Sequence, residues 1–145
     1  FGDDVTLLDV ASHEATHAVI TEGIIDGKRT PRWADEGISM HAESAKTFAT
    51  NKKDFEKLYN EIGSFSLKDL MTMECPDRPD YRQLYYGQSF MLTNFLARTK
   101  DPSVVLQFAA TDMDDAAVKK YYGFETLEDL EKAWKKDAEN LLKTK

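Results

Sequence analysis

Apolar residues recur along most of the chain at the three- and four-residue spacing of helices, and no long stretch alternates apolar with polar side chains. Near the beginning, Val10 and Ile20 share one helical face with two histidines. Near the end, Leu127, Trp134 and Leu141 form a stripe typical of a helix packed on a core. The pattern therefore predicts a mainly α domain with little or no β-sheet.

Turn and capping residues divide this pattern into separate helices. Thr30-Pro31 is typical of a helix start, and Thr126-x-x-Asp129 resembles a capping box. The predicted helices cover, in chain order, residues 4–25, 31–45, 51–62, 81–99, 101–111, 114–122 and the segment after 126, with a short turn at 66–71.

Composition and charge exclude several functional classes. The 145 residues carry 19 Lys and Arg against 26 Asp and Glu, a net charge of −7, without the basic patch that nucleic-acid binding needs. No apolar run approaches the roughly 20 residues of a membrane span, and the lone Cys75 excludes an internal disulfide. Because the chain begins at Phe1 without a recognisable leader, we interpret residues 1–145 as one domain, either mature or a piece of a longer chain.

The segment His13-Glu14-x-x-His17 is the strongest chemical signal. Residues at positions i and i+4 of a helix lie one turn apart on the same face, so both imidazoles can reach one ion. Glu14 lies one position round the helix, where it can take a proton from a water on that ion without being a ligand. Imidazole ligands suit zinc, so the motif predicts one Zn²⁺ per chain.

A stable zinc site needs a third protein ligand, and Glu36 is the best candidate. About seven residues follow His17 in the first helix, roughly 10 Å, and Glu36 lies roughly 7.5 Å into the second helix. If the two helices run antiparallel, Glu36 returns to the level of His17. Asp35 faces away from Glu36 and is a weaker candidate.

The remaining polar residues of these helices allow other interpretations. Asp9 and Glu43 are both candidates for orienting a histidine ligand through its second ring nitrogen. His41 lies off the Glu36 face and is predicted at the surface. The two motif histidines can also be ordinary buried residues with hydrogen-bond partners, in which case the chain is a structural helical domain.

The motif and the later segment Trp33-Ala34-Asp35-Glu36-Gly37 resemble the gluzincin metallopeptidases of the thermolysin-like clan, most closely the peptidase MA-like domains. The likeness continues in Tyr86-Gly87-Gln88-Ser89-Phe90 and in the last segments of the chain. It implies a zincin-like helical domain, with an active-site helix and an antiparallel helix that carries the glutamate ligand.

The resemblance also implies the chemistry. The zinc ligands are expected to be His13, His17 and Glu36, with Glu14 as the general base and a peptide or protein as substrate. Gluzincins often stabilise the transition state with a downstream Tyr or His; Tyr86 is our choice, and Tyr81 and Tyr85 compete with it. Relatives of this bacterial type are often exported, which implies a secreted or periplasmic location.

One family feature is missing from the pattern. Gluzincins usually place a small β-sheet before the motif helix, and its edge strand holds the peptide. Here the twelve residues before His13 are predicted to be helical. Either an upstream segment carries that sheet, or this is a minimal all-helical version of the domain. We expect activity to rise when an upstream segment or a partner supplies the strand, and we keep an inactive zinc-binding interaction domain as the alternative function.

Overall fold

The computed structural model describes residues 7–22 and 29–144, and within the first helix it describes the side chains of residues 11–20. The described residues form eight helices and no strand. They are, in chain order, α1 (Leu7–Glu22), α2 (Arg32–Met40), α3 (Ala45–Ile62), α4 (Leu67–Thr72), α5 (Pro79–Thr99), α6 (Pro102–Ala109), α7 (Asp115–Tyr122) and α8 (Leu127–Lys143). The predicted mainly α fold is confirmed for this part of the chain.

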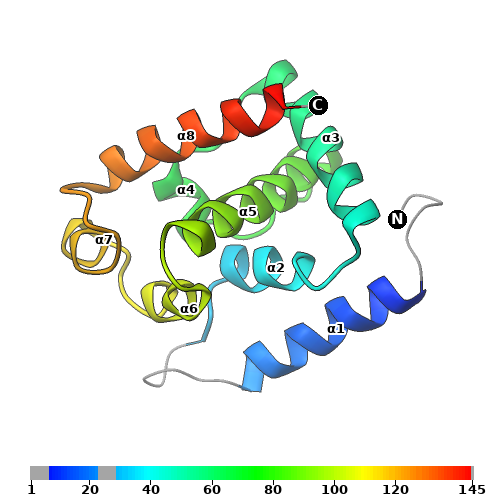
Figure 1. The fold of residues 1–145 in the computed structure, drawn as a ribbon, viewed down its shortest axis with the longest axis horizontal. Helices are drawn as coiled ribbons and strands as arrows, with labels where there is room; N and C mark the ends of the chain where they lie inside the picture. Colours follow the sequence, from blue (N-terminus) through cyan, green and yellow to red (C-terminus); the bar gives the residue numbers. More distant parts are fainter. Residues whose placement is uncertain (1–6, 23–28, 145) are drawn as a thin grey trace.

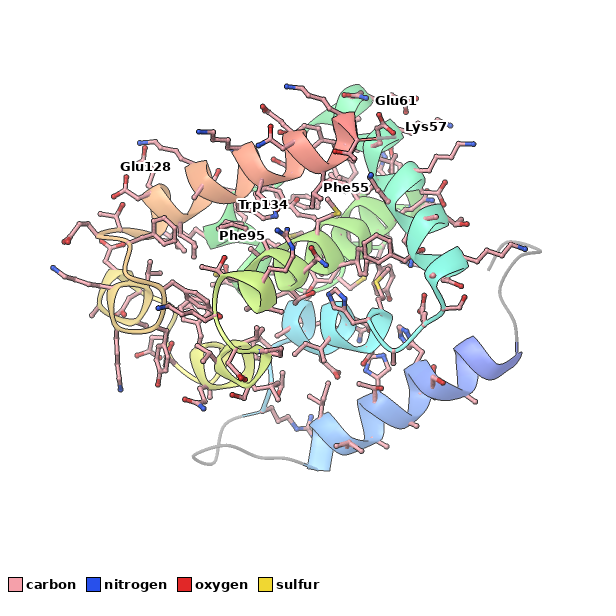
Figure 2. The ribbon with its side chains drawn as sticks, viewed as in Figure 1. Phe55, Lys57, Glu61, Phe95, Glu128 and Trp134 are labelled. Atoms are coloured by element: carbon pink, nitrogen blue, oxygen red, sulfur yellow. The ribbon has the colours of Figure 1, made fainter. Side chains whose placement is uncertain are left out.

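The long helix α5 lies at the centre, and α2, α3, α6 and α8 pack around it (Figure 1). Figure 2 shows Trp134 of α8 and Phe95 of α5 where these two helices face each other, with Phe55 beside the meeting of α3 and α5. Trp134 is fully buried, and Phe55 is nearly so. The apolar stripe predicted on the last helix is therefore its core-facing side.

The helix α2 is held unusually close to α5 at Gly37. A Cβ atom built there would lie 2.5 Å from the backbone oxygen of Ser89 and 2.6 Å from the side chain of Thr93. Only glycine fits such a crossing without moving one helix. Because α5 is fixed in the core, this contact also fixes the position of Glu36, the residue before Gly37.

The boundary between the second and third helices differs from the prediction. The predicted ranges of 31–45 and 51–62 are wrong, since α2 ends at Met40 and α3 already begins at Ala45. Ser44 causes the early start, because its Oγ accepts a hydrogen bond from the backbone N–H of Thr47 at 3.3 Å. The start of α2 is also one residue later than predicted, with Pro31 at the N-cap.

Residues 63–80 lie between the predicted helices 51–62 and 81–99, and they are more ordered than Pro76 and Pro79 suggest. The turn predicted at 66–71 is the short helix α4, capped by Ser66. Pro79 begins α5 instead of preceding it as a breaker. Proline has no N–H to lose in the first turn of a helix, so it is as compatible with a helix start as with a break.

The helices after α5 begin within one residue of the prediction, although α6 ends at Ala109, two residues before the predicted end at 111. The side chains of Asp101, Asp114 and Thr126 each accept a backbone hydrogen bond at the start of a helix. Gly123 ends α7 in the left-handed conformation, with φ of 79°. The predicted first-helix ends at 4–6 and 23–25, and the turn at 26–27, lie outside the described residues.

The first helix lies on the outside of the molecule and packs against α2, with which it runs antiparallel (Figure 1). This antiparallel arrangement is the one that was expected to bring Glu36 to the level of His17. The outer face of α1 is open to solvent, and the side chain of Val19 is 73% exposed. None of the helices described is long and apolar enough to cross a membrane.

Candidate metal centre

Three side chains converge where α1 faces α2. The Nε2 atoms of His13 and His17 lie 2.9 Å apart. One carboxylate oxygen of Glu36, Oε2, lies 3.6 Å from Nε2 of His13 and 3.3 Å from Nε2 of His17. Among the described residues this is the group of His, Cys, Asp and Glu side chains whose atoms can hold a metal ion together.

The spacing of these atoms matches a tetrahedral zinc site. Zinc binds nitrogen and carboxylate oxygen at about 2.0–2.2 Å, so two ligand atoms of a tetrahedron lie about 3.3–3.5 Å apart. The three distances between the ligand atoms, 2.9, 3.3 and 3.6 Å, bracket this value. Three protein ligands leave a fourth position, which is the arrangement of a catalytic rather than a structural zinc site.

The second nitrogen of each histidine ring is held by a carboxylate. Nδ1 of His13 lies 2.7 Å from Oε1 of Glu43, and Nδ1 of His17 lies 2.8 Å from Oδ1 of Asp35. A carboxylate can only accept, so each Nδ1 carries a hydrogen, and each Nε2 is left to bind either a proton or a metal ion. Two lone pairs and a carboxylate oxygen that face one another need a cation between them, which is why the residues present fit a bound zinc ion.

The negative charge around the histidines also favours a bound cation. Contacts with Glu36 and then Glu43 raise the pKa of His13 to about 9 in the protein without metal. Burial raises the pKa of Glu36, but the contact with His13 and the charges of His17 and Arg32 outweigh burial and hold that pKa below its ordinary value. Glu36 is therefore an anion at neutral pH, and a metal ion bound here would take the place of the proton on His13.

These contacts assign the acids that the sequence left open. Glu43 holds His13, and its other oxygen accepts a hydrogen bond from Asn51 of α3 at 3.2 Å. Asp35, considered as a weaker third ligand, holds His17 instead. The side chain of Asp9, the other candidate for this role, is outside the described part of the chain.

The centre opens into a cleft of about 1020 Å³ between α1, α2, α3 and α5. Glu14 lines this cleft on α1 beside His13 and is exposed, so it is accessible to a water molecule. The cleft is lined by His13, Glu14, His17, Arg32, Asp35, Glu36, Met40, Glu43, Thr47, Thr50, Asn51, Asp54, Phe55, Pro79, Arg82, Gln83, Tyr86 and Gly87.

Of the three candidate tyrosines, only Tyr86 lines the cleft. Tyr85 is fully buried, and its hydroxyl finds no hydrogen-bond partner among the described residues. The ring of Tyr81 packs against Phe65 and under the guanidinium of Arg78, 4.7 Å from the ring centre. Burial raises the pKa of Tyr86, so its hydroxyl keeps a proton to donate.

Sequence reasoning did not single out Arg32, the first residue of α2. Its Nη2 lies 3.0 Å from Oε1 of Glu36 and donates to the hydroxyl of Tyr86 at 3.3 Å. The spacing of four residues between Arg32 and Glu36 was a readable signal for an ion pair on one helix face. The link to Tyr86 crosses to another helix and has no signal in the sequence.

His41, the residue that caps the end of α2, lies apart from the centre, as predicted. The residue is exposed, its ring stacks on Phe90 with centroids 4.7 Å apart, and Nε2 lies 3.0 Å from Oγ1 of Thr93. It is therefore engaged at the back of α2 and takes no part in the group around His13 and His17.

Comparison with known proteins shows which family the chain belongs to. No curated protein and no solved structure gives a significant match to the chain. The model of the Peptidase MA superfamily, in contrast, matches residues 8–140, which include both histidines, all four helices that line the cleft and most of the last helix. The chain therefore belongs to the Peptidase MA superfamily.

Proposed function

We propose that this protein is a zinc-dependent metallopeptidase that binds one Zn²⁺ and hydrolyses peptide bonds. The observation that carries the proposal is the convergence of His13, His17 and Glu36, with both outer histidine nitrogens fixed by carboxylates. Such carboxylate–histidine pairs orient the ring and make it a better ligand. Family membership supports a peptide or protein as the substrate.

In this proposal His13, His17 and Glu36 hold the ion, which when bound polarises the scissile carbonyl and lowers the pKa of a water molecule. Glu14 takes the proton of the attacking water and passes it to the leaving amine as the peptide bond breaks. Tyr86 donates its hydroxyl hydrogen to the carbonyl oxygen as negative charge develops there. The open cleft gives a peptide room to lie across the three groups.

The alternative is a domain that binds zinc but does not cleave and serves as an interaction module. One observation favours it, since the described residues offer no strand along which a peptide could be held extended. We also propose an extracytoplasmic location, which a fractionation experiment on the source cells would test.

The test combines metal analysis with two substitutions that separate ligand from base. His17→Ala is expected to lose most of the bound zinc, because two ligands hold the ion far more weakly than three. Glu14→Gln is expected to keep one zinc per chain and to lose the casein hydrolysis that the wild type shows in the same form of the chain, because an amide cannot accept the water proton at neutral pH.

Two outcomes would contradict the proposal. Full zinc content in His17→Ala would show that the metal, if any, binds elsewhere. Loss of zinc in Glu14→Gln would make Glu14 a ligand instead of the base. Wild-type protein with zinc but no chelator-sensitive hydrolysis of any substrate, even in a longer form of the chain, would favour the inactive interaction domain.

A further inference from the structure

The guanidinium of Arg32 connects two groups with different roles in the proposed function. Its Nη2 atom lies 3.0 Å from the Glu36 oxygen Oε1 and 3.3 Å from the hydroxyl of Tyr86. Glu36 belongs to α2 and Tyr86 to α5, so one side chain ties the third candidate ligand to the candidate oxyanion donor. The Glu36 side chain is 10% exposed, whereas that of Arg32 is 50% exposed at the rim of the cleft.

The contact with Glu36 divides the roles of the two carboxylate oxygens. Oε2 faces both histidines, at 3.6 and 3.3 Å from their Nε2 atoms, and Oε1 faces Arg32. The ion pair with Arg32 holds Oε1 turned away from the histidines, so that Oε2 alone is placed to reach a metal ion between them. Without that bond, Glu36 can rotate to bind with both oxygens and fill the position where a water must lie.

The contact with Tyr86 decides the direction of its hydroxyl hydrogen. A phenol oxygen can accept one hydrogen bond and donate one, and Arg32 can only donate. Because Arg32 fills the acceptor side, the hydroxyl hydrogen must point elsewhere. Cys75 lies within hydrogen-bonding reach of this hydroxyl, but a thiol sulfur is a weak acceptor, and Tyr86 lines the cleft, so a substrate oxygen there can take the hydrogen in its place.

We propose that Arg32 is a positioning residue that keeps Glu36 a one-oxygen ligand and turns the Tyr86 hydroxyl into a donor toward the substrate carbonyl. This inference rests on the proposed function, because both effects matter only in a metallopeptidase. The alternative is an ordinary ion pair between residues four apart on a partly exposed helix face, which has little effect on anything else.

The first experiment replaces the metal by Co²⁺, whose visible spectrum reports the number of its ligands. Arg32→Gln is expected to shift the spectrum from a four-coordinate to a five-coordinate form, because Glu36 then binds with both oxygens. Arg32→Lys keeps the positive charge and is expected to retain most of the wild-type spectrum. Arg82→Gln is the matched control, since Arg82 lines the same cleft but donates to the backbone oxygens of Pro76 and Asp77.

The second experiment measures binding of a phosphinic peptide, whose anionic tetrahedral centre imitates the transition state. Tyr86→Phe is expected to weaken this binding roughly tenfold or more, as loss of a hydrogen bond to a charged group does. In the Arg32→Gln background, Tyr86→Phe is expected to weaken phosphinic peptide binding hardly further, because Arg32 no longer orients the Tyr86 hydroxyl. Binding of an uncharged substrate peptide serves as the reference and is expected to change little.

A third measurement needs no metal, so it tests the contact between Arg32 and Tyr86 even if the proposed function is wrong. Thermal unfolding of the metal-free wild type, the two single variants and the double variant gives the coupling between Arg32 and Tyr86 directly. A coupling is expected, since the two side chains contact each other. Circular dichroism checks that each variant is folded before its metal and ligand data are used.

The inference is overturned if Arg32→Gln keeps the wild-type Co²⁺ spectrum, or if Tyr86→Phe weakens phosphinic peptide binding equally in both backgrounds. Zero coupling in the metal-free protein would overturn it as well. Failure of the proposed function has a different signature: the wild-type protein would then bind no metal, and the thermal coupling alone would still decide the contact between Arg32 and Tyr86.

Discussion

At the scale of single residues, the acids around the histidines have separate tasks. Glu36 points an oxygen between the two rings, whereas Glu43 and Asp35 hold the rings from outside. The sequence predicted the positions of His13, His17 and Glu36 because helix geometry fixes which residues share a face. It left Glu43 and Asp35 open because a turn and a neighbouring face decide their direction, and neither follows from periodicity.

Glu43 provides a test of this outer layer. Glu43→Ala is expected to lower zinc affinity about 10- to 100-fold, because the ring of His13 loses the partner that orients it. Competition with a coloured chelator measures the affinity. Glu61→Ala is the control, since Glu61 is exposed near the end of α3 that lies away from α1 (Figure 2).

An unchanged affinity in Glu43→Ala would contradict this role. It would mean that the ring of His13 is held by packing alone and that the 2.7 Å contact with Glu43 adds nothing to metal binding. An equal loss in Glu61→Ala would instead point to a general effect of removing negative charge.

At the scale of helices, the crossing of α2 over α5 sets the level of the metal centre. Gly37→Ala is expected to destabilise the protein by roughly 1–3 kcal/mol, because its Cβ meets the Ser89 backbone oxygen at 2.5 Å. Urea unfolding measures the change. A decrease in the free energy of unfolding would be informative, because replacing Gly by Ala inside a helix otherwise stabilises the helix by roughly 1 kcal/mol. A variant as stable as the wild type would show that the two helices have room to separate.

Helix ends show where prediction from the sequence stops. Ends with a strong cap, such as those at Asp101 and Asp114, were predicted because their signals are local. The end of α2 at Met40 was missed because the helical pattern continues through it, and Ser44 acts as a cap only once the chain turns there. That turn brings Glu43 to His13. The same turn therefore explains why the sequence predicted neither the end of α2 nor the role of Glu43.

At the scale of the whole molecule, α1 is the least supported of the helices that form the centre. It packs against α2 on one side, and Val19 on its outer face is 73% exposed. A metal ion held by His13 and His17 of α1 and by Glu36 of α2 would join the two helices. Removal of the metal by a chelator is therefore expected to speed amide hydrogen exchange in residues 7–22 far more than in α5.

The control for this exchange experiment is His17→Ala. Because that variant is expected to lack metal, a chelator should not change its exchange in α1, and its untreated pattern should match that of the stripped wild type. Equal exchange of α1 with and without metal in the wild type would show that α1 is held by α2 alone.

The last prediction concerns how a substrate is held across the whole cleft. A metallopeptidase must keep its peptide extended so that the scissile carbonyl, the water and the base meet together. An edge strand does this through main-chain hydrogen bonds that are largely indifferent to side chains. Residues 7–22 and 29–144 form helices joined by loops and no strand, and most backbone groups of the helices are used within each helix. A cleft built only from them can bind side chains but offers no row of free backbone groups.

We therefore predict that the 145-residue chain binds zinc but digests casein slowly or not at all. The rate should rise when a longer form of the chain or a partner supplies a strand beside the cleft, because the peptide is then held in line with Glu14 and Tyr86. The measurement is casein digestion by the short and the longer form at equal zinc occupancy, with chelator-treated samples as blanks. Equal rates from the two forms would show that the helices position the substrate unaided, and the missing strand would then have no bearing on catalysis.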